Sequence, residues 1–362
     1  MSETEFKLID SQRRKGRAAA SNPDNRFESM TRIAVDDGWA RDECLAPLRT
    51  EVSFERPRRV ITRNTSPDLH FDRSINPYRG CEHGCIYCFA RPSHAFLGLS
   101  PGLDFETRLI ARPTAPELLA KELARKSYKP RVIAIGTNTD PYQPIEKKHE
   151  IMRGILRVLA KYKHPVGVVT KGSLIERDLD ILGPLGQAGL ARAGISMTSL
   201  SSDLSRRMEP RVPSPARRLK MIERLARAGC PVRVMVSPLV PGLTDHELES
   251  ILQAARDAGA VSASYIPLRL PLEVADLFRD WLDEHYPDRA ARVMARVRET
   301  QGGKDYESEF GTRLTGQGEY AKLIAQRFQI ATARLGLVQD LPPLRTDLFT
   351  VPKAASRQLS LF

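Results

Sequence analysis

The sequence predicts an α/β fold: a partial (β/α)6 TIM-like barrel with an N-terminal extension and a C-terminal helical segment. Between residues 72 and 285, short apolar runs alternate with longer segments of helical periodicity. The apolar runs are nearly continuous, as expected of parallel strands that are buried on both faces. Repeated βα units form parallel sheets with right-handed crossovers, and six of them suit an incomplete barrel.

The first strand is expected just before Cys81, and five further strands follow it. They are predicted at 131–136, 166–170, 193–197, 232–237 and 261–266. Helical patterns lie between the strands, at 116–127, 146–162, 176–187, 215–228 and 246–258, with another near 272–284. Gly229 and Gly259 lie where helix-ending glycines are expected. In such barrels the chemistry takes place at the carboxyl ends of the strands.

The segments on either side of the barrel differ from it in pattern. Residues 1–71 have no sustained period and form a basic arm or extension, followed by the barrel over 72–285. Helical periodicity continues through 286–340, and a flexible tail is expected over 341–362. We therefore divide the chain into four parts.

Composition and charge limit the functional class. The chain has 362 residues, a formal net charge of +12 and five cysteines. Such a charge favours a polyanionic partner, nucleic acid above all. Part of it lies on one helical stripe, Arg217, Lys220, Arg224 and Arg227, which also suits a solvated outer face. No apolar run is long enough to span a membrane, so no membrane partner is expected and the cytoplasm is the predicted location.

Three of the cysteines form the strongest motif. Cys81, Cys85 and Cys88 follow the spacing C-x3-C-x2-C on the loop after the first predicted strand. A structural zinc site needs four protein ligands, and His83 or His94 lies close enough to supply the fourth. A four-iron cluster on three cysteines would instead keep one iron open for a reacting ligand. Both interpretations stand at this point.

Polar residues and glycines follow the other predicted strands. The second strand runs into residues 136–142, the third into 170–173, the fourth into 196–199 and the fifth into 237–242. Asn, Thr, Ser and Gly are also ordinary turn residues, so one such loop would mean little. Four consecutive ends that face the cysteine loop indicate a ligand site.

These motifs resemble the radical S-adenosylmethionine superfamily over roughly residues 72–285. The segments 79–88 (RGCEHGCIYC), 136–142 (GTNTDPY) and Thr170-Lys171 are similar to the branch related to spore photoproduct lyase, a DNA repair enzyme. The resemblance implies a radical enzyme that holds a [4Fe-4S] cluster on Cys81, Cys85 and Cys88. It implies that S-adenosylmethionine binds the open iron and is reductively cleaved to a 5′-deoxyadenosyl radical. A reductant protein such as flavodoxin or ferredoxin would supply the electron.

The same resemblance assigns contacts for S-adenosylmethionine. Thr139 and Asp140 correspond to the contact after the second strand, and Lys171 to a lysine near the cofactor carboxylate. The ribose falls near Ser196 and Thr198, and the adenine near Pro241 and Gly242.

One position departs from the lyase. Its hydrogen-donor cysteine aligns with Asn138, and neither Cys44 nor Cys230 is an obvious replacement. Cys230 follows Gly229 and precedes a strand, so a buried structural role is expected. The resemblance therefore implies the fold and the radical chemistry, but it does not imply the reaction that the lyase itself catalyses.

The chain ends in Gln358–Phe362 (QLSLF), behind a polar spacer. This pentapeptide resembles the motif by which bacterial DNA polymerases and repair proteins dock on the replicative sliding clamp. Such a peptide places Leu361 and Phe362 in an apolar pocket, while Gln358 fixes the register. An apolar tail that folds back on its own barrel is the alternative.

Three functional hypotheses follow. The first is a radical S-adenosylmethionine enzyme that acts on nucleic acid, with DNA as the preferred substrate, in repair or modification. The second is the same chemistry on RNA, a protein or a small molecule. The third is a non-catalytic zinc or iron–sulfur binding module.

Overall fold

A seven-stranded sheet forms the centre of the protein. The computed structural model describes residue 9 and residues 11–28 and 46–352. The strand order is β10-β9-β8-β7-β6-β3-β2, and all neighbours are parallel except the antiparallel edge strand β2. The bounds are β2 Thr62–Arg63, β3 Arg73–Ile75, β6 Ile133–Ile135, β7 Val166–Thr170, β8 Ala191–Ser196, β9 Val232–Leu239 and β10 Ser262–Pro267. The six parallel strands and the open edge confirm the predicted partial barrel.

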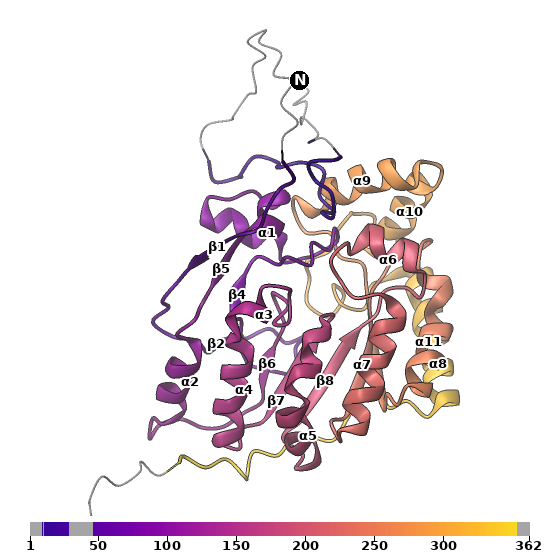
Figure 1. The fold of residues 1–362 in the computed structure, drawn as a ribbon. Coiled ribbons are helices and arrows are strands. Elements are labelled where there is room, and N and C mark those ends of the chain that lie inside the picture. The colour runs from indigo at the N-terminus through magenta and orange to yellow at the C-terminus, as the bar shows by residue number, and fades with distance from the viewer. Residues whose placement is uncertain (1–8, 10, 29–45, 353–362) are drawn as a thin grey trace, which may run out of the picture.

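Helices cover the outer face of the sheet, as Figure 1 shows for α4, α5 and α7. The longer helices are α2 Ala115–Leu123, α4 Ile151–Lys161, α5 Leu179–Gln187, α7 Pro215–Arg227, α8 Leu248–Asp257, α9 Val274–His285, α10 Pro287–Thr300 and α11 Gly318–Leu335. Short helices are α1 Leu103–Thr107, α3 Glu146–His149 and α6 Ser202–Met208, with 3-10 turns η1 Arg91–Leu97, η2 Ser173–Asp178 and η3 Asp245–Glu247. No described helix is long and apolar enough to cross a bilayer.

The core fills the space between strands and helices. Ile135, Val168, Ile195 and Val234 are fully or almost fully buried, and they pack in one apolar cluster with residues of the covering helices. Burying such side chains contributes roughly 1.5–3 kcal/mol each. This core fixes the positions of the strand ends, and therefore of the loops that follow them.

Two details differ from the sequence prediction. The helix expected over 146–162 is divided into α3 and α4, because Glu150 adopts a left-handed backbone with φ of 50°. A second sheet, in the order β1-β5-β4, was not anticipated as a unit; its strands are β1 Glu51–Phe54, β4 Tyr78–Arg79 and β5 Arg108–Ala111. Its pairings join segments far apart in the chain, Glu51 with Arg108 and Tyr78 with Ala111, which periodicity cannot reveal.

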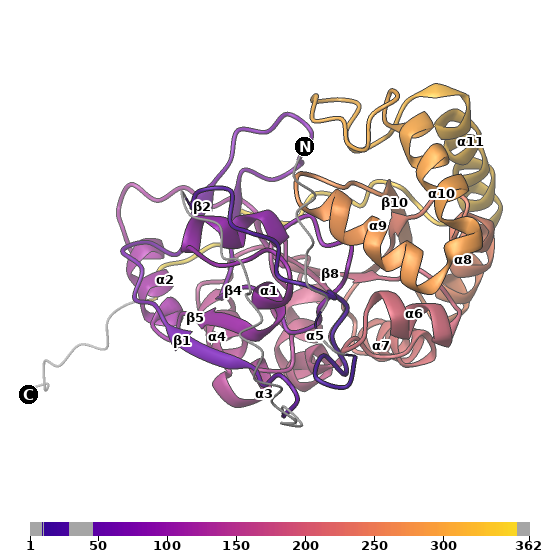
Figure 2. The ribbon, with the colours of Figure 1, turned by 90° about the horizontal axis from the view of Figure 1, so that it is seen from above.

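The two ends of the described chain lie on opposite sides of the barrel. Seen from above, the N-terminal segment (indigo) runs beside α1 over the strand ends (Figure 2). The last described residues cross the opposite side: Val338 bridges Ser262, and the amide of Thr350 donates to the carbonyl of Tyr162 at 3.0 Å. The boundaries at residues 71, 285 and 340 stay predictions.

Candidate active site

The cysteine loop is held by a buried ion pair that the sequence did not indicate. Arg91 and Glu106 are both fully buried, and Nη2 of Arg91 lies 2.6 Å from Oε1 of Glu106. Arg91 also donates to the carbonyls of Gly84 and Cys85, at 3.1 and 3.0 Å. A buried pair of this kind is stable only when further hydrogen bonds satisfy both groups. The Arg91–Glu106 pair therefore holds the cysteine loop in place in the absence of any ligand.

Glu106 also anchors the N-terminal segment. Its carboxylate accepts hydrogen bonds from the amides of Ala18 and Ala19, at 3.1 and 3.0 Å. Gly84 approaches the same carboxylate so closely that a Cβ would stand 2.6 Å from Oε2, and its φ of 65° favours glycine. The cysteine loop and the N-terminal segment thus share one anchor.

The three cysteines lie on this loop as free thiols. Cys81 and Cys85 are buried and Cys88 is half-buried. Burial raises the pKa of each thiol, and the carboxylate of Asp140 and the neighbouring thiols raise the pKa of Cys81 further. Thiols in this environment bind metal as thiolates only when cationic iron or zinc compensates the charge and displaces the protons.

The described residues contain no group of three or more His, Cys, Asp or Glu side chains that could hold one metal ion. The ligands of a four-iron cluster bind different irons, so they need not converge on a single point. His83 and His94, the alternative zinc ligands, have partners in the protein. Nδ1 of His83 lies 3.3 Å from Asp140, and Nε2 of His94 lies 2.9 Å from the carbonyl of Arg108. The donor set fits a cluster on three thiolates.

Asp140 connects the ends of β6 and β7 next to Cys81. Its carboxylate accepts from the amide of Lys171 at 2.7 Å and from the hydroxyl of Thr170 at 2.5 Å. Burial alone would raise the pKa of Asp140, but His83 and these hydrogen bonds outweigh it and lower the pKa. Thr139 donates to the carbonyl of Tyr78 at 3.0 Å. Both predicted residues lie beside the cysteine loop, with their side chains engaged inside the protein.

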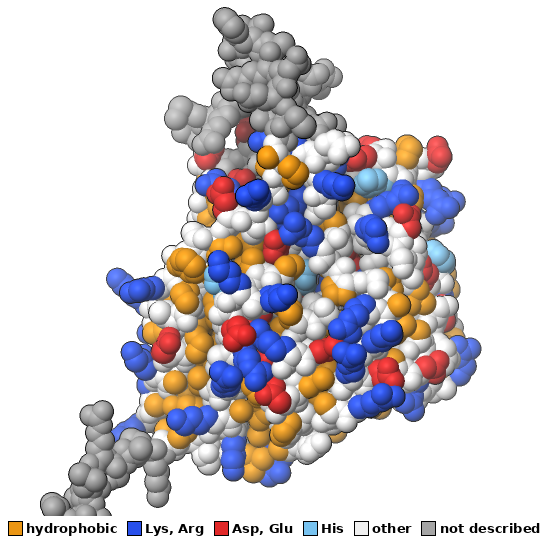
Figure 3. Space-filling model, viewed as in Figure 1, with side chains coloured by type: hydrophobic (Ala, Val, Ile, Leu, Met, Phe, Trp, Pro, Cys, Tyr) orange, Lys and Arg blue, Asp and Glu red, His pale blue; other side chains and the backbone are white. Residues whose placement is uncertain are grey.

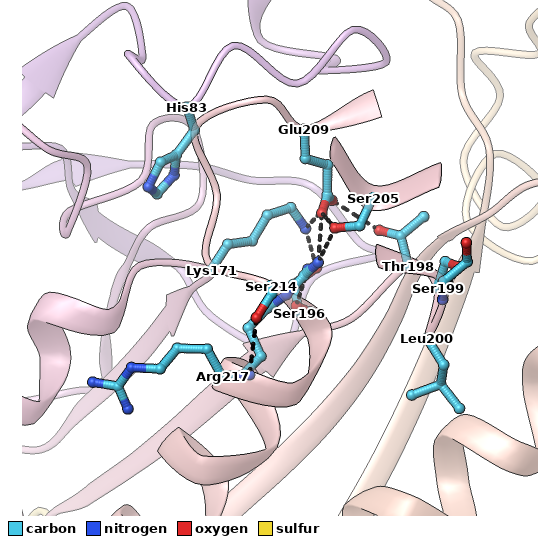
Figure 4. A network of polar contacts seen from close by, with 12 residues as sticks. His83, Lys171, Ser196, Thr198, Ser199, Leu200, Ser205, Glu209, Ser214 and Arg217 are labelled. Atoms are coloured by element: carbon cyan, nitrogen blue, oxygen red, sulfur yellow. Dashed lines mark hydrogen bonds and ion pairs between the residues drawn. The ribbon is translucent and has the colours of Figure 1, made fainter. Parts of the chain in front are cut away.

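A network of buried polar side chains joins the next strand ends (Figure 4). Nζ of Lys171 contacts the hydroxyl of Ser196 and lies 3.6 Å from Oε1 of Glu209. Thr198 donates to the same carboxylate at 3.0 Å. The hydroxyl of Tyr87, within the cysteine loop, also donates to this carboxylate. The structure thus brings three predicted residues, Lys171, Ser196 and Thr198, together with the loop.

Glu209 and Arg218 complete the network, and sequence reasoning missed both. Nη2 of Arg218 lies 2.7 Å from Oε2 of Glu209, and both side chains are fully buried. Burial works against ionisation of Glu209, but Arg218 and Lys171 outweigh it and lower its pKa to about 2. Glu209 is one of few acids among the many Arg and Lys residues between positions 203 and 233, and this was the available signal. Only the fold shows that the two buried charges meet.

The remaining predicted residues lie at the end of β9. Pro241 is buried, and Gly242 forms a turn with φ of 74° whose amide donates to Asp245 at 3.0 Å. Asn138, at the end of β6, makes no side-chain hydrogen bond to any described residue. Cys230 is buried at the start of β9, as expected, and burial raises its pKa to about 12. Cys44 lies outside the described residues.

The comparisons with known proteins agree with this geometry. Residues 75–255, half of the chain, match the family profile of the Radical SAM superfamily. The protein belongs to the radical SAM superfamily. Members of this superfamily use a [4Fe-4S] cluster and S-adenosylmethionine, which agrees with the three thiols and the polar strand ends of this chain.

Relatives and solved structures resemble the chain as well. Uncharacterised proteins of Mycobacterium tuberculosis and Mycobacterium bovis are 36% identical over 226 residues, which is 62% of this chain. The match spans 66% of their length, just under two thirds. An uncharacterised protein of Methanocaldococcus jannaschii is 26% identical over 59% of this chain and 76% of its own. Structures of spore photoproduct lyase, one complexed with dinucleoside spore photoproduct, have the same fold, with a TM-score of 0.57 at 15% identity over 80% of this chain and 81% of theirs.

Proposed function

We propose that this radical SAM enzyme holds its cluster on Cys81, Cys85 and Cys88 and acts on nucleic acid, with DNA as the preferred substrate. The observation that carries the proposal is the cysteine loop itself. It presents three free thiols beside the Lys171–Glu209 network, at the carboxyl ends of the strands. Held on Cys81, Cys85 and Cys88, the cluster would supply the one-electron reduction of bound S-adenosylmethionine, and with it the radical chemistry that removes a hydrogen atom from the substrate.

The residues of the network bind and orient S-adenosylmethionine. The ammonium of Lys171 binds the cofactor carboxylate, and Glu209 and Ser196 hold that ammonium in place. Ser196 and Thr198 contact the ribose, while Pro241 and Gly242 flank the adenine. Thr139 and Asp140 shape the wall beside Cys81. The N-terminal segment that crosses the strand ends restricts the access of water to the radical.

Charge and structural similarity support a nucleic-acid substrate. The net charge is +12, and Figure 3 shows Lys and Arg side chains distributed over one face with Asp and Glu among them. The basic stripe on α7 contributes little free positive charge for binding nucleic acid. Arg217 and Arg224 both pair with Glu176, and Arg227 pairs with Glu223. Spore photoproduct lyase, which shares the fold, has been crystallised with a dinucleoside lesion. The amide of Asn138 cannot donate a hydrogen atom as a thiol does, so the reaction differs from that of the lyase in this step.

The tail extends the proposal to a partner. Gln358–Phe362 lies outside the described residues, but the chain approaches it from the side opposite the strand ends. Docking of this pentapeptide on the replicative sliding clamp therefore leaves the active site accessible to DNA. A flavodoxin or ferredoxin supplies the electron, and the cytoplasm provides both partners.

Anaerobic reconstitution with iron and sulfide tests the enzyme. We expect a brown protein that forms 5′-deoxyadenosine after reduction, faster when ultraviolet-damaged DNA is added. A colourless protein with one zinc ion would contradict the cluster assignment. Stimulation by RNA, a protein or a small molecule but not by DNA would contradict the substrate.

Pull-down of the sliding clamp tests the tail. We expect the intact chain to retain the clamp and a chain that lacks Gln358–Phe362 to lose it. A matched deletion of five residues inside the spacer, 353–357, controls for shortening of the tail. Equal retention by both truncated chains would refute clamp docking through the pentapeptide.

A further inference from the structure

A polar cavity of about 180 Å³ lies beside the cysteine loop. Its wall comes from β4, which leads into the loop, from η1, which follows the loop, and from the carboxyl end of β6. The lining includes Asn76, Arg79, Ser93, Leu97, Arg112 and Asn138. The cavity therefore adjoins the place where the radical is formed, and the cluster and the S-adenosylmethionine contacts do not account for it.

The charge of the cavity is positive. Arg79 donates to the carboxylate of Glu55 through Nε and Nη2, at 2.9 and 3.1 Å. Arg112 donates to the same carboxylate through Nε and Nη2, both at 3.2 Å. Two guanidinium groups face one carboxylate, which leaves an excess of one positive charge. Within the described chain, Nη1 of Arg79 has no hydrogen-bond partner, so it can donate to a ligand.

Glu55 also fixes the geometry of the two guanidinium groups. Arg112 is anchored a second time, because its Nη1 donates to the carbonyl of Asn76 at 3.1 Å. Guanidinium groups held in this way lose little conformational freedom when they bind an oxyanion. The two guanidinium groups are thus preorganised to bind an anion.

The uncharged lining offers further polar groups. No described residue makes a hydrogen bond to the side chain of Asn138, which can therefore donate two hydrogen bonds. The side-chain oxygen of Asn76 is buried and has no partner among the residues that the structure describes. Because this oxygen is an acceptor, it can bind a hydroxyl or amino group of the adjoining nucleotide, but not the phosphodiester oxygens, which carry no proton.

Size and surroundings define the ligand. A cavity of about 180 Å³ is smaller than a usual drug-sized site of roughly 300–1,000 Å³, so it takes a phosphoryl group rather than a whole nucleotide. Phe96 precedes Leu97 on η1, is 72% exposed and lies 5.0 Å from the ring of Phe27, centroid to centroid. Exposed aromatic rings of this kind stack with bases. The guanidinium of Arg26 lies over both rings, 4.7 Å from the centroid of Phe27 and 5.4 Å from that of Phe96, so this pair also carries positive charge. Since η1 supplies Phe96 as well as two residues of the cavity wall, Ser93 and Leu97, a nucleotide chain is favoured over free phosphate.

We propose that the Arg79–Arg112 pocket binds one backbone phosphate of the nucleic-acid substrate and positions the adjoining nucleotide at the strand ends. The inference rests on the proposed function in that it takes nucleic acid as the substrate. Glu55 acts as a placeholder that orients both arginines and competes with the phosphate for their donors.

Equilibrium binding to the reconstituted enzyme tests the pocket. The probe is a fluorescein-labelled single-stranded 12-mer, used with phosphodiester linkages and again with neutral methylphosphonate linkages. We expect Arg79→Gln to weaken binding of the phosphodiester 12-mer about tenfold. Arg227→Gln removes the same charge from the outer face of α7 and is expected to change binding less than about twofold. Neither variant should affect the binding of the neutral 12-mer.

Two further variants separate binding from folding. Asn138→Ala removes a side chain without partners in the described chain, so it should keep the melting temperature and weaken binding about threefold. Glu55→Gln removes the competing carboxylate and should tighten binding several-fold. If Glu55, Arg79 and Arg112 had a purely structural role, Glu55→Gln would weaken binding of the 12-mer, as Arg79→Gln does. This result would overturn the proposal.

The outcomes distinguish the pocket from the substrate assignment. If the wild type binds the 12-mer and Arg79→Gln matches Arg227→Gln, the pocket is refuted and the nucleic-acid substrate stands. If the wild type binds no 12-mer, but inorganic phosphate raises its melting temperature and not that of Arg79→Gln, the pocket stands and the nucleic-acid substrate falls. If neither probe binds, both are refuted.

Discussion

The carboxylate of Glu209 lies 2.7 Å from the guanidinium of Arg218, and both side chains are fully buried. Arg218 also donates to the carbonyl of Ser196 at 3.0 Å and to the hydroxyl of Ser205 at 2.8 Å. The pair therefore fixes the end of β8 and orients Glu209 toward Lys171 and Tyr87. It links the stability of the barrel to the geometry of the site.

Arg218→Met should destabilise the protein by about 3–5 kcal/mol, because it leaves the Glu209 charge buried without its main partner. Chemical denaturation measures the loss. Arg227→Met is the matched control, since Arg227 is exposed on the same helix, and its effect should stay within about 0.5 kcal/mol. Equal effects of the two substitutions would show that the buried pair contributes no special stability.

His164 should make the protein less stable as the pH falls from neutral. Burial lowers its pKa to about 4, from an ordinary value of 6.5, and its two ring nitrogens contact Tyr128 and the carbonyl of Pro165. The unfolded chain takes up a proton below about pH 6.5, while the folded chain resists protonation down to about pH 4. The stabilising effect of the neutral ring is therefore complete above 6.5 and is lost toward 4.

Between pH 7 and pH 5, this one residue should cost about 2 kcal/mol of stability. Denaturation curves at several pH values measure the slope. His164→Gln should flatten it in this range, whereas His246→Gln, which changes a mostly exposed ring, should leave it unchanged. A slope that survives His164→Gln would assign the effect to other groups.

Cys85→Ala should abolish cluster assembly, because it removes one of the three proposed thiolate ligands. The measured iron content should fall from about four irons per chain to nearly none, with loss of the brown colour. Cys230→Ala is the control, since that buried thiol lies at the start of β9, away from the loop. A full cluster in Cys85→Ala would refute the ligand assignment.

Lys171→Gln should weaken the binding of S-adenosylmethionine about 10–100-fold while the cluster is retained, because a hydrogen bond to a charged group contributes about 1.5–3 kcal/mol. Calorimetric titration of the reconstituted protein measures the affinity. Lys220→Gln, on the exposed face of α7, should not change it. Unchanged affinity in Lys171→Gln would remove this lysine from the cofactor site.

The sequence alone predicted the barrel because its signals are local. A strand such as β7, Val166–Thr170, is a short apolar run, and Gly229 and Gly259 follow α7 and α8 with φ of 89° and 101°. The cysteine spacing is equally local. Parallel strands place the loops after them at one edge of the sheet, so Lys171 and Ser196 were expected near the cysteines, and the structure brings them there.

Only the tertiary structure decided which polar groups meet inside the protein. Arg91 and Glu106 are 15 residues apart, and Arg79 and Glu55 are 24 residues apart, yet each pair is in contact. Nothing in the spacing of such residues distinguishes a buried pair from two solvated charges. Local patterns thus determined the elements and the thiol loop. Packing determined the buried ion pairs, the cavity beside the loop and the partners of each charge, because these depend on distances through space rather than along the chain.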